Sequence, residues 1–257
     1  MLTTNVLQRT FWIRLTHQSD GQTIHSYGTA FSIDVKNKQY LITASHVIKY
    51  VQDKDIVGIF HDNQWKPIDI TVVGRGCADN PETDVAVLAT TCHLDPSCPG
   101  MYYQLKTATA GFTLGQQVYF CGFPYNLYTE IQENNGYPVP MIKGALISGK
   151  IKKINAPELF VLDGHNNPGF SGGPVAFQQG RGQVTEFQII GIVSSYHFNN
   201  APVIYQNEST GQQEVTKLVS KENAGIILCP SIKQVIDMIE NNPIGFELPS
   251  DKVTELP

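Results

Sequence analysis

The sequence carries little charge and has no long apolar run. Charged residues make up 16% of its 257 residues, and 18 basic against 23 acidic side chains give a formal net charge of −5. The basic residues form no run longer than Lys152-Lys153, so we expect no nucleic-acid partner. No stretch approaches the roughly 18 apolar residues of a membrane span, and the first fifteen residues lack the charged and apolar regions of a secretion signal. We therefore expect no membrane partner and a cytoplasmic location.

Cysteine is also scarce, with five in all, an odd number. Without a secretion signal we expect mostly reduced thiols in the core. Cys77, Cys92, His93 and Cys98 are the one group that resembles a metal site. Five residues separate Cys92 from Cys98, however, and this spacing fits no common zinc knuckle. We expect no metal.

Glycine and proline, 22 and 15 residues, are scattered as turn formers rather than gathered in a repeat. Between them recur short runs rich in Val, Ile, Thr, Tyr and Phe, which are typical of antiparallel sheets closed into barrels or sandwiches. The pattern predicts an all-β protein. The expected strands lie near 6–16, 28–35, 39–43, 56–60, 67–74, 84–89, 116–121, 143–154, 158–162, 174–177, 186–194 and 224–228.

About twelve strands suffice for two antiparallel barrels of about six each. One helix is predicted, because Ile232, Val235, Ile236 and Ile239 share a helical face and Ser231 and Gln234 have capping-box spacing. We expect this helix to pack on the preceding barrel. The predicted divisions are a first barrel at 1–95, a linker at 96–111, a second barrel at 112–229, the helix at 230–241 and a surface or disordered tail at 242–257.

The strongest chemical signal is the segment NPGFSGGP at 167–174. Glycines packed this closely around Ser171 indicate a backbone in unusual conformations, with an exposed hydroxyl and converging N–H groups. A plain Gly-Pro turn is the structural alternative. The letters also fit the nucleophile elbow of α/β-hydrolases, whose triad runs Ser, acid, His. After Ser171, however, His197 is the only histidine and Glu186 the only acidic residue before it, and the sequence lacks the helices of a parallel sheet. We reject that interpretation.

Two upstream segments complete a pattern with Ser171. His46 follows an apolar run in YLITASHV, and Asp84 opens another in TDVAVL. Taken singly, each is ordinarily a hydrogen-bonded histidine or a turn cap. The order His46, Asp84, Ser171 is that of one serine-protease triad.

These three segments, with Gly191-Ile-Val-Ser194, resemble those of the chymotrypsin/trypsin-like serine peptidases, and the resemblance covers roughly residues 8–240. It implies two six-stranded β-barrels and a triad of His46, Asp84 and Ser171. It also implies an oxyanion hole formed by the N–H groups of Gly169 and Ser171, and a Ser194 hydroxyl that supports Asp84. No cofactor is needed for such chemistry.

The sequence departs from the digestive enzymes of this family at the residue before Ser171 and in the substrate pocket. Phe170 replaces the aspartate that pairs with a newly cut N-terminus, so we expect activity without zymogen cleavage, as in bacterial and viral-type members. His165 replaces the acidic pocket floor, and Val193 stands where enzymes specific for Glu or Gln carry histidine. With Tyr196 at the pocket entrance, these features favour small or medium apolar residues. The expected substrate-binding residues are His165, Ser194, Ser195 and Tyr196.

Two functions remain open: a serine endopeptidase acting on protein or peptide substrates, and a trypsin-fold interaction module in which cleavage is restrained. A regulatory partner is a further possibility, because an uncut intracellular protease endangers its host. The polar stretches at 122–141 and 197–222 are predicted to be mobile surface loops, and one of them is expected to gate the cleft.

Overall fold

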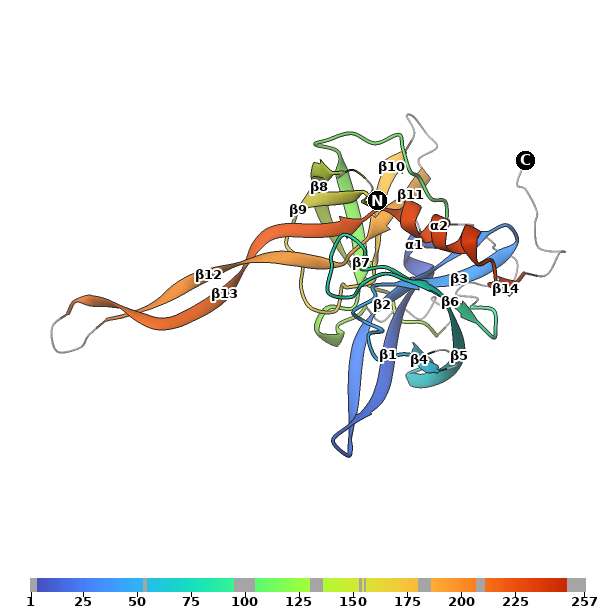
Figure 1. The fold of residues 1–257 in the computed structure, drawn as a ribbon, viewed down its shortest axis with the longest axis horizontal. Coiled ribbons are helices and arrows are strands. Elements are labelled where there is room, and N and C mark those ends of the chain that lie inside the picture. The colour runs from blue at the N-terminus through green and yellow to red at the C-terminus, as the bar shows by residue number, and fades with distance from the viewer. Residues whose placement is uncertain are drawn as a thin grey trace.

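The computed structural model describes residues 4–52, 55–94, 105–129, 136–152, 154, 156–179, 186–206 and 211–248. Almost all of its regular structure is β-strand, arranged in two sheets side by side (Figure 1), and the expected all-β class with a C-terminal helix is confirmed. None of the helices in the described ranges is long and apolar enough to cross a membrane.

The first sheet closes into a barrel because β3 pairs with both β2 and β6. Its hairpins have two-residue turns with positive φ at both positions, Asp20-Gly21, Lys36-Asn37 and Asp62-Asn63, as type I′ turns require. The strands run in the order β14-β3-β2-β1-β4-β5-β6, with β14 added beside the ring of six. Their bounds are β1 Thr10–Ser19, β2 Gln22–Val35, β3 Lys38–Thr43, β4 Ile56–His61, β5 Gln64–Arg75, β6 Ala86–Thr90 and β14 Phe246–Glu247.

The second sheet also has seven strands, in the order β11-β10-β7-β8-β9-β13-β12. A single antiparallel bridge between Gly191 and Ser231 links β11 to the end of β13, so six of the strands form the second barrel and β12 extends beyond them. Their bounds are β7 Gln117–Gly122, β8 Met141–Ile151, β9 Leu159–Asp163, β10 Pro174–Gln179, β11 Glu186–Ile192, β12 Ser195–Gln206 and β13 Gln213–Pro230.

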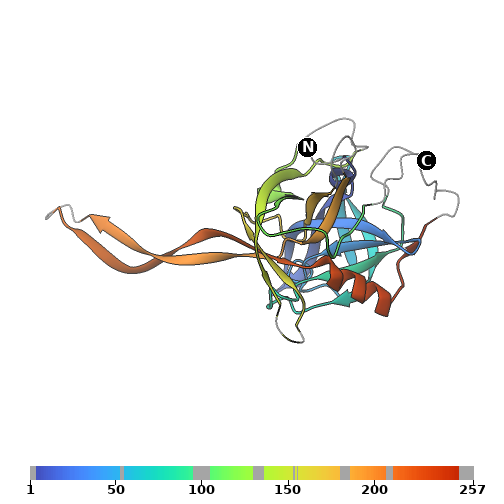
Figure 2. The ribbon, with the colours of Figure 1, turned by 90° about the horizontal axis from the view of Figure 1, so that it is seen from above.

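The prediction of a mobile loop at 197–222 is wrong. Most of this stretch belongs to β12 and β13, which form a long hairpin projecting from the body of the molecule (Figures 1 and 2). The sequence shows no strand pattern here because both faces of the hairpin are largely exposed, and no buried face imposes alternation.

Three short elements complete the fold: α1 (Thr4–Gln8), the 3₁₀ turn η1 (Pro124–Asn126) and α2 (Ile232–Asn241). Contrary to expectation, α2 packs on both barrels, against β11 of the second and β5 and β6 of the first. The capping box is half correct. Ser231 caps the helix by accepting from the Lys233 N–H, but the Gln234 amide donates to the Glu82 carbonyl in the first barrel, 2.9 Å away.

The core has three parts. Two clusters fill the interiors of the two barrels, and a third joins residues of both barrels to α2. Strand β3 shows why its sequence is apolar without alternation: Leu41 faces the first interior while Tyr40 and Ile42 face the interbarrel core. The tail continues this packing, since Phe246 pairs with Gln39 of β3; the tail beyond Leu248 lies outside the described residues.

Candidate active site

His46 lies in the turn that follows β3. The buried Ser45 hydroxyl beside it donates to the Val85 carbonyl at 2.8 Å and to the Gly76 carbonyl at 2.9 Å. These bonds tie the histidine turn to the segment that leads into β6, where Asp84 lies. The two residues are thus brought together by neighbouring strands of the first barrel, β3 and β6.

The Asp84 carboxylate fixes the His46 ring. One oxygen accepts from the His46 backbone N–H at 2.8 Å, and the other lies 2.7 Å from Nδ1 of the ring. The Asp84 side chain is 2% exposed, whereas that of His46 is 38% exposed. A nearly buried carboxylate against Nδ1 holds the ring with its other nitrogen available to the cavity.

Ser194 adds a third hydrogen bond to the same carboxylate. Its hydroxyl donates to Oδ2 of Asp84 at 2.6 Å, and both side chains are buried. The bond crosses between the barrels, because Ser194 lies between β11 and β12. Asp84 is therefore satisfied by three donors despite its burial, as a buried charge requires.

Ser171 lies in the loop between β9 and β10, and its carbonyl accepts from the Thr29 N–H of the first barrel at 3.0 Å. Its hydroxyl donates to the Ser194 carbonyl at 3.1 Å. Among the hydrogen bonds of the described residues, none joins Ser171 to His46. Rotation about the Cα–Cβ bond of Ser171 changes the partner of this hydroxyl without moving the backbone.

The turn before the nucleophile, residues 167–170, is a type II turn. The Phe170 N–H donates to the Asn167 carbonyl at 3.3 Å, Pro168 occupies the second position, and Gly169 at the third has φ +105°. A Cβ on Gly169 would lie 2.3 Å from the Phe123 carbonyl oxygen. Within the described chain, the N–H groups of Gly169 and Ser171 donate to no other group. Both donors are therefore available to a ligand.

Two hydrogen bonds hold this turn from outside, and a third holds one of the two donors. The Tyr125 N–H donates to the Pro168 carbonyl at 3.1 Å, and the Thr29 hydroxyl donates to the Gly169 carbonyl at 2.6 Å. The Phe123 N–H in turn donates to the Thr29 hydroxyl at 3.2 Å. Because a peptide C=O and N–H point in opposite directions, fixing the Pro168 carbonyl also fixes the direction of the Gly169 N–H. Sequence reasoning missed Thr29 and Tyr125, because only the fold brings them to the turn.

A cavity of about 390 Å³ contains His46, Asp84 and Ser171. Three of the four predicted substrate-binding residues, Ser194, Ser195 and Tyr196, line it. The fourth, His165, is exposed and is not among the lining residues. The wall also includes residues that the sequence did not suggest: Ala78, Asp79, Pro81 and Phe198.

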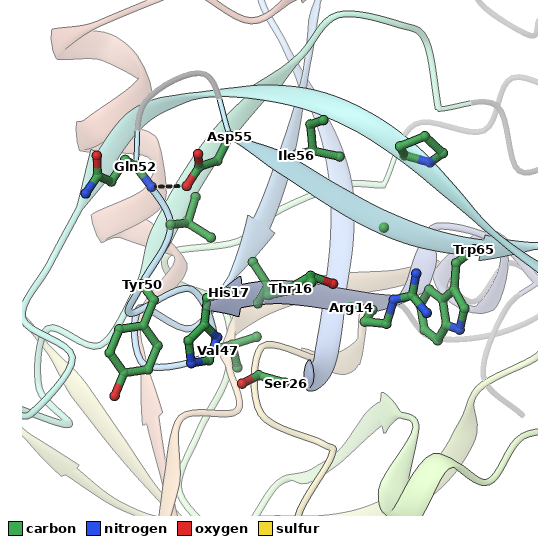
Figure 3. A pocket seen from close by; sticks show the side chains of 14 residues that line it. Arg14, Thr16, His17, Ser26, Val47, Tyr50, Gln52, Asp55, Ile56 and Trp65 are labelled. Atoms are coloured by element: carbon green, nitrogen blue, oxygen red, sulfur yellow. Dashed lines mark hydrogen bonds between the residues drawn. The ribbon is translucent and has the colours of Figure 1, made fainter. Parts of the chain in front are cut away.

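A larger cavity of about 760 Å³ lies on the first barrel, between β1, β4 and the segment that follows His46. Figure 3 shows His17 and Tyr50 together at one end of it and Arg14 beside Trp65 at the other. The His17 and Tyr50 rings stack at 4.5 Å, and the Arg14 guanidinium lies 4.7 Å from the Trp65 ring centroid. This cavity contains none of the three residues His46, Asp84 and Ser171, so the smaller cavity is the candidate active site.

The cysteines that the structure describes are all free thiols. Cys77 and Cys92 are exposed free thiols, Cys121 and Cys229 are buried ones, and Cys98 lies outside the described residues. No cluster of three or more His, Cys, Asp or Glu side chains suited to a metal ion occurs in the described part of the chain.

Comparison with known structures supports the fold. The active form of the Rv3671c protease from M. tuberculosis is 17% identical, with a TM-score of 0.55 over 97% of this chain and 87% of that one. The inactive form of the same protein, a serine-to-alanine mutant from strain H37Rv, is also 17% identical, with a TM-score of 0.50 over 93% and 88% of the two chains. At this identity the likeness establishes the fold alone.

A search among curated proteins finds no match. Residues 28–184, more than half of the chain, match the family described as "Trypsin-like peptidase domain". The matched range contains His46, Asp84 and Ser171 within the two-barrel fold. The chain therefore belongs to the trypsin-like peptidase domain family.

Proposed function

We propose that this protein is a serine endopeptidase that cleaves peptide or protein substrates through Ser171, His46 and Asp84. The observation that carries the proposal is the His46–Asp84 hydrogen bond of 2.7 Å in the cavity that also contains the Ser171 hydroxyl. A serine hydroxyl is a weak nucleophile at neutral pH and needs an adjacent base. In this cavity, the imidazole held by Asp84 is that base.

The proposed reaction begins when the Ser171 hydroxyl leaves the Ser194 carbonyl and turns toward His46. The serine oxygen attacks the substrate carbonyl carbon while the imidazole takes the hydroxyl proton. The C–N bond then breaks, and the imidazolium returns the proton to the leaving amine. Water, deprotonated by the same imidazole, hydrolyses the acyl-enzyme and regenerates the serine. Asp84 holds the imidazole in the required tautomer and stabilises the imidazolium.

The negative oxygen of the tetrahedral intermediate is assigned to the N–H groups of Gly169 and Ser171. Their lack of other partners and the positive φ of Gly169 support this role. A type I turn at 167–170 would reverse the peptide between Pro168 and Gly169 and turn one donor away. A donor of this kind contributes about 3 kcal/mol to transition-state stabilisation.

The same turn supports activity without zymogen cleavage. Phe170 is fully buried, and its ring packs on Phe120 at 5.0 Å, where related digestive enzymes have an ion pair. The bonds from Thr29 and Tyr125 hold the turn in place of that pair. For the substrate, the aromatic wall of Tyr196 and Phe198 favours a small or medium apolar residue at the cleaved position.

One observation favours the alternative, a restrained module that binds peptides without efficient cleavage. The Ser171 hydroxyl is bonded to the Ser194 carbonyl rather than to His46. In enzymes without substrate, however, catalytic hydrogen bonds are often long or misaligned and tighten only in the complex.

Labelling by a fluorophosphonate probe tests both functions. We expect the uncut protein to be labelled at Ser171, and Ser171→Ala to remain unlabelled. Labelling of the folded wild type no stronger than that of Ser171→Ala would exclude the peptidase and favour the binding module. Cleavage of an unbiased peptide library, with the same alanine variant as control, then gives the preferred residue.

The role of Asp84 has a test of its own. Asp84→Asn should lower kcat about 10⁴-fold, because the amide stabilises the wrong imidazole tautomer and not the imidazolium. The measurement is kcat on the best library peptide, with circular dichroism to verify folding. A folded Asp84→Asn variant that retains more than a tenth of wild-type kcat would contradict the assigned role.

A further inference from the structure

The hairpin of β12 and β13 is the most exposed regular structure in the described chain, and it projects well clear of both barrels (Figures 1 and 2). Only its base is part of the barrel, where residues 226–230 of β13 pair with β9. From Phe198, which pairs with Asn223, to Gln206, which pairs with Gln213, the hairpin is a two-stranded ribbon. Such ribbons are at best marginally stable alone in water.

This ribbon exposes apolar side chains instead of covering them. Cross-strand pairs place Ile204 opposite Val215 and Pro202 opposite Val219, and the exposed fractions of Val215 and Val219 are 67% and 62%. Single apolar residues on a surface are common, but a group of them on a protruding ribbon indicates a binding surface. The remaining exposed apolar residues of the ribbon are Phe198, Tyr205 and Leu218.

Strand β12 is also the edge of its sheet, with β13 as its single partner in the described chain. Edge strands usually carry charges, above all lysine, that prevent another strand from pairing with them. The twelve residues of β12, SYHFNNAPVIYQ, include no Asp, Glu, Lys or Arg. Pro202 lacks the N–H of a ladder hydrogen bond, and the register with β13 shifts between His197 and Phe198 and between Pro202 and Ile204. The stretches between these irregularities, residues 198–201 and 204–206, are open to an added strand.

The edge is continuous with the candidate active site. Ser195, Tyr196 and Phe198, at the start of β12, line the cavity that contains Ser171. The Ser194 carbonyl just before them accepts the Ser171 hydroxyl. A peptide held at Ser171 therefore enters the edge of β12 directly. At about 3.3 Å per residue, the twelve residues of the strand extend this edge for about 40 Å.

We propose that the free edge of β12 binds an extended, apolar segment of a polypeptide substrate, which adds to the sheet as a further strand and continues outward from the cleft. Backbone hydrogen bonds supply the affinity, and the exposed apolar side chains favour a segment rich in apolar residues. The inference rests on the proposed peptidase function and specifies its substrate class. Unfolded or extended chains become better substrates than short peptides, because a short peptide cannot reach the ribbon.

The test compares two peptides with the same cleavage site, one of about four residues and one of about twenty with an apolar flank. A shortened variant joins Phe198 to Asn223 through an Asn-Gly turn, in place of residues 199–222. We expect kcat/KM for the short peptide to stay within about twofold of wild type, and that for the long peptide to fall at least about tenfold, the equivalent of roughly 1.4 kcal/mol.

A point variant keeps the test valid if the shortened protein does not fold. Ile204→Lys with Tyr205→Lys places charge on the proposed binding edge, and should weaken the long peptide alone. Gln212→Lys with Gln213→Lys adds the same charge at the same end of the hairpin but removes no apolar side chain, and should leave both peptides nearly unchanged.

The outcomes separate the two proposals. If kcat/KM falls equally for both peptides, or falls for neither, the proposed binding at β12 is wrong, while the proposed peptidase function is unaffected. If the wild type is neither labelled at Ser171 nor able to cleave the short peptide, the proposed peptidase function is itself wrong. A wild-type dimer in sedimentation that becomes a monomer in the lysine variant, without any dependence on peptide length, would show that a second copy occupies the edge, and would also overturn the proposal.

Discussion

At the scale of single residues, the buried Thr29 has an unusual position. Its side chain links the first barrel to the nucleophile loop of the second by accepting from the Phe123 N–H and donating to the Gly169 carbonyl, and its own carbonyl accepts the Thr43 hydroxyl at 2.7 Å. A single hydroxyl thus positions the peptide that follows Gly169. Its loss should loosen the 167–170 turn, whose Gly169 N–H is assigned to the proposed oxyanion hole, without touching the triad.

Thr29→Val should therefore lower kcat about tenfold with little change in KM, since a buried carbonyl that loses its donor costs about 1–3 kcal/mol. Steady-state kinetics checks this, together with the affinity for a peptide aldehyde, which should weaken in parallel with kcat. Thr29→Ser keeps the hydroxyl and should restore most of the activity. Thr90→Val removes a buried hydroxyl bonded to the Cys92 carbonyl, far from the loop, and serves as the control. A rise in KM alone would indicate substrate binding instead.

Gly169 is the second residue whose replacement has a defined effect. Gly169→Ala combines a positive φ with a Cβ only 2.3 Å from the Phe123 carbonyl, so the turn must change and one oxyanion donor is lost. We expect kcat to fall about 10²–10³-fold. Gly21→Ala has a similar positive φ, +74°, but no atom within 4 Å of the added Cβ, and its kcat should match wild type. Equal kcat in both variants would refute the assigned role of the Gly169 N–H.

At the scale of elements, α2 connects the two barrels. Ile232, Val235 and Ile239 are buried in the interbarrel core with residues of β3, β6 and β11. The amphipathic pattern predicts the buried face of the helix, but it gives only one of its two partners, the second barrel. An apolar face specifies that a helix is buried, and not what it is buried against.

Ile239→Ala should lower the free energy of unfolding by about 2–5 kcal/mol, because it leaves a cavity between the barrels. Urea denaturation followed by fluorescence measures the change. Lys233→Ala, on the exposed side of the same helix, removes an ion pair with Asp237 and should cost less than about 0.5 kcal/mol. Similar losses in the two variants would mean that α2 does not stabilise the interface.

At the scale of the whole molecule, the candidate active site belongs to neither barrel alone. His46 and Asp84 come from the first and Ser171 and Ser194 from the second, and the Ser194–Asp84 bond of 2.6 Å joins them. The relative placement of the barrels therefore sets the geometry on which the proposed catalysis depends. The interbarrel core and α2 maintain that placement.

The compactness of the fold also determines which thiols react. Burial raises the pKa of Cys121 and Cys229 well above the ordinary range, and neither is accessible to solvent. Iodoacetamide on the native protein should alkylate Cys77 first, and Cys92 more slowly, because partial burial and the charge of Asp69 raise its pKa. Cys121 and Cys229 should react only after denaturation. Site-resolved mass spectrometry checks the order, and rapid alkylation of Cys121 in the native protein would contradict the structure.

Much of the candidate site could be predicted from the sequence because its signals are local. Three of these signals are patterns among neighbours in the chain. They are the glycines around Ser171, the apolar run followed by a turn at His46, and Asp84 directly before the next apolar run. The all-β class and the helix at the C-terminal end likewise follow from periodicity over a few residues. In each case, residues close together in the chain determine the backbone conformation of a turn or the buried face of a strand or helix.

What only the tertiary structure decided depends on contacts between distant segments. Gln234 has capping-box spacing yet bonds to Glu82, 152 residues away, and Thr29 reaches Gly169 across 140 residues. His165 was expected in the pocket and is exposed instead, and the polar stretch after Ser195 is a strand ribbon rather than a loop. Local periodicity carries no information on such pairs, because packing selects the partner from every segment that the fold brings near.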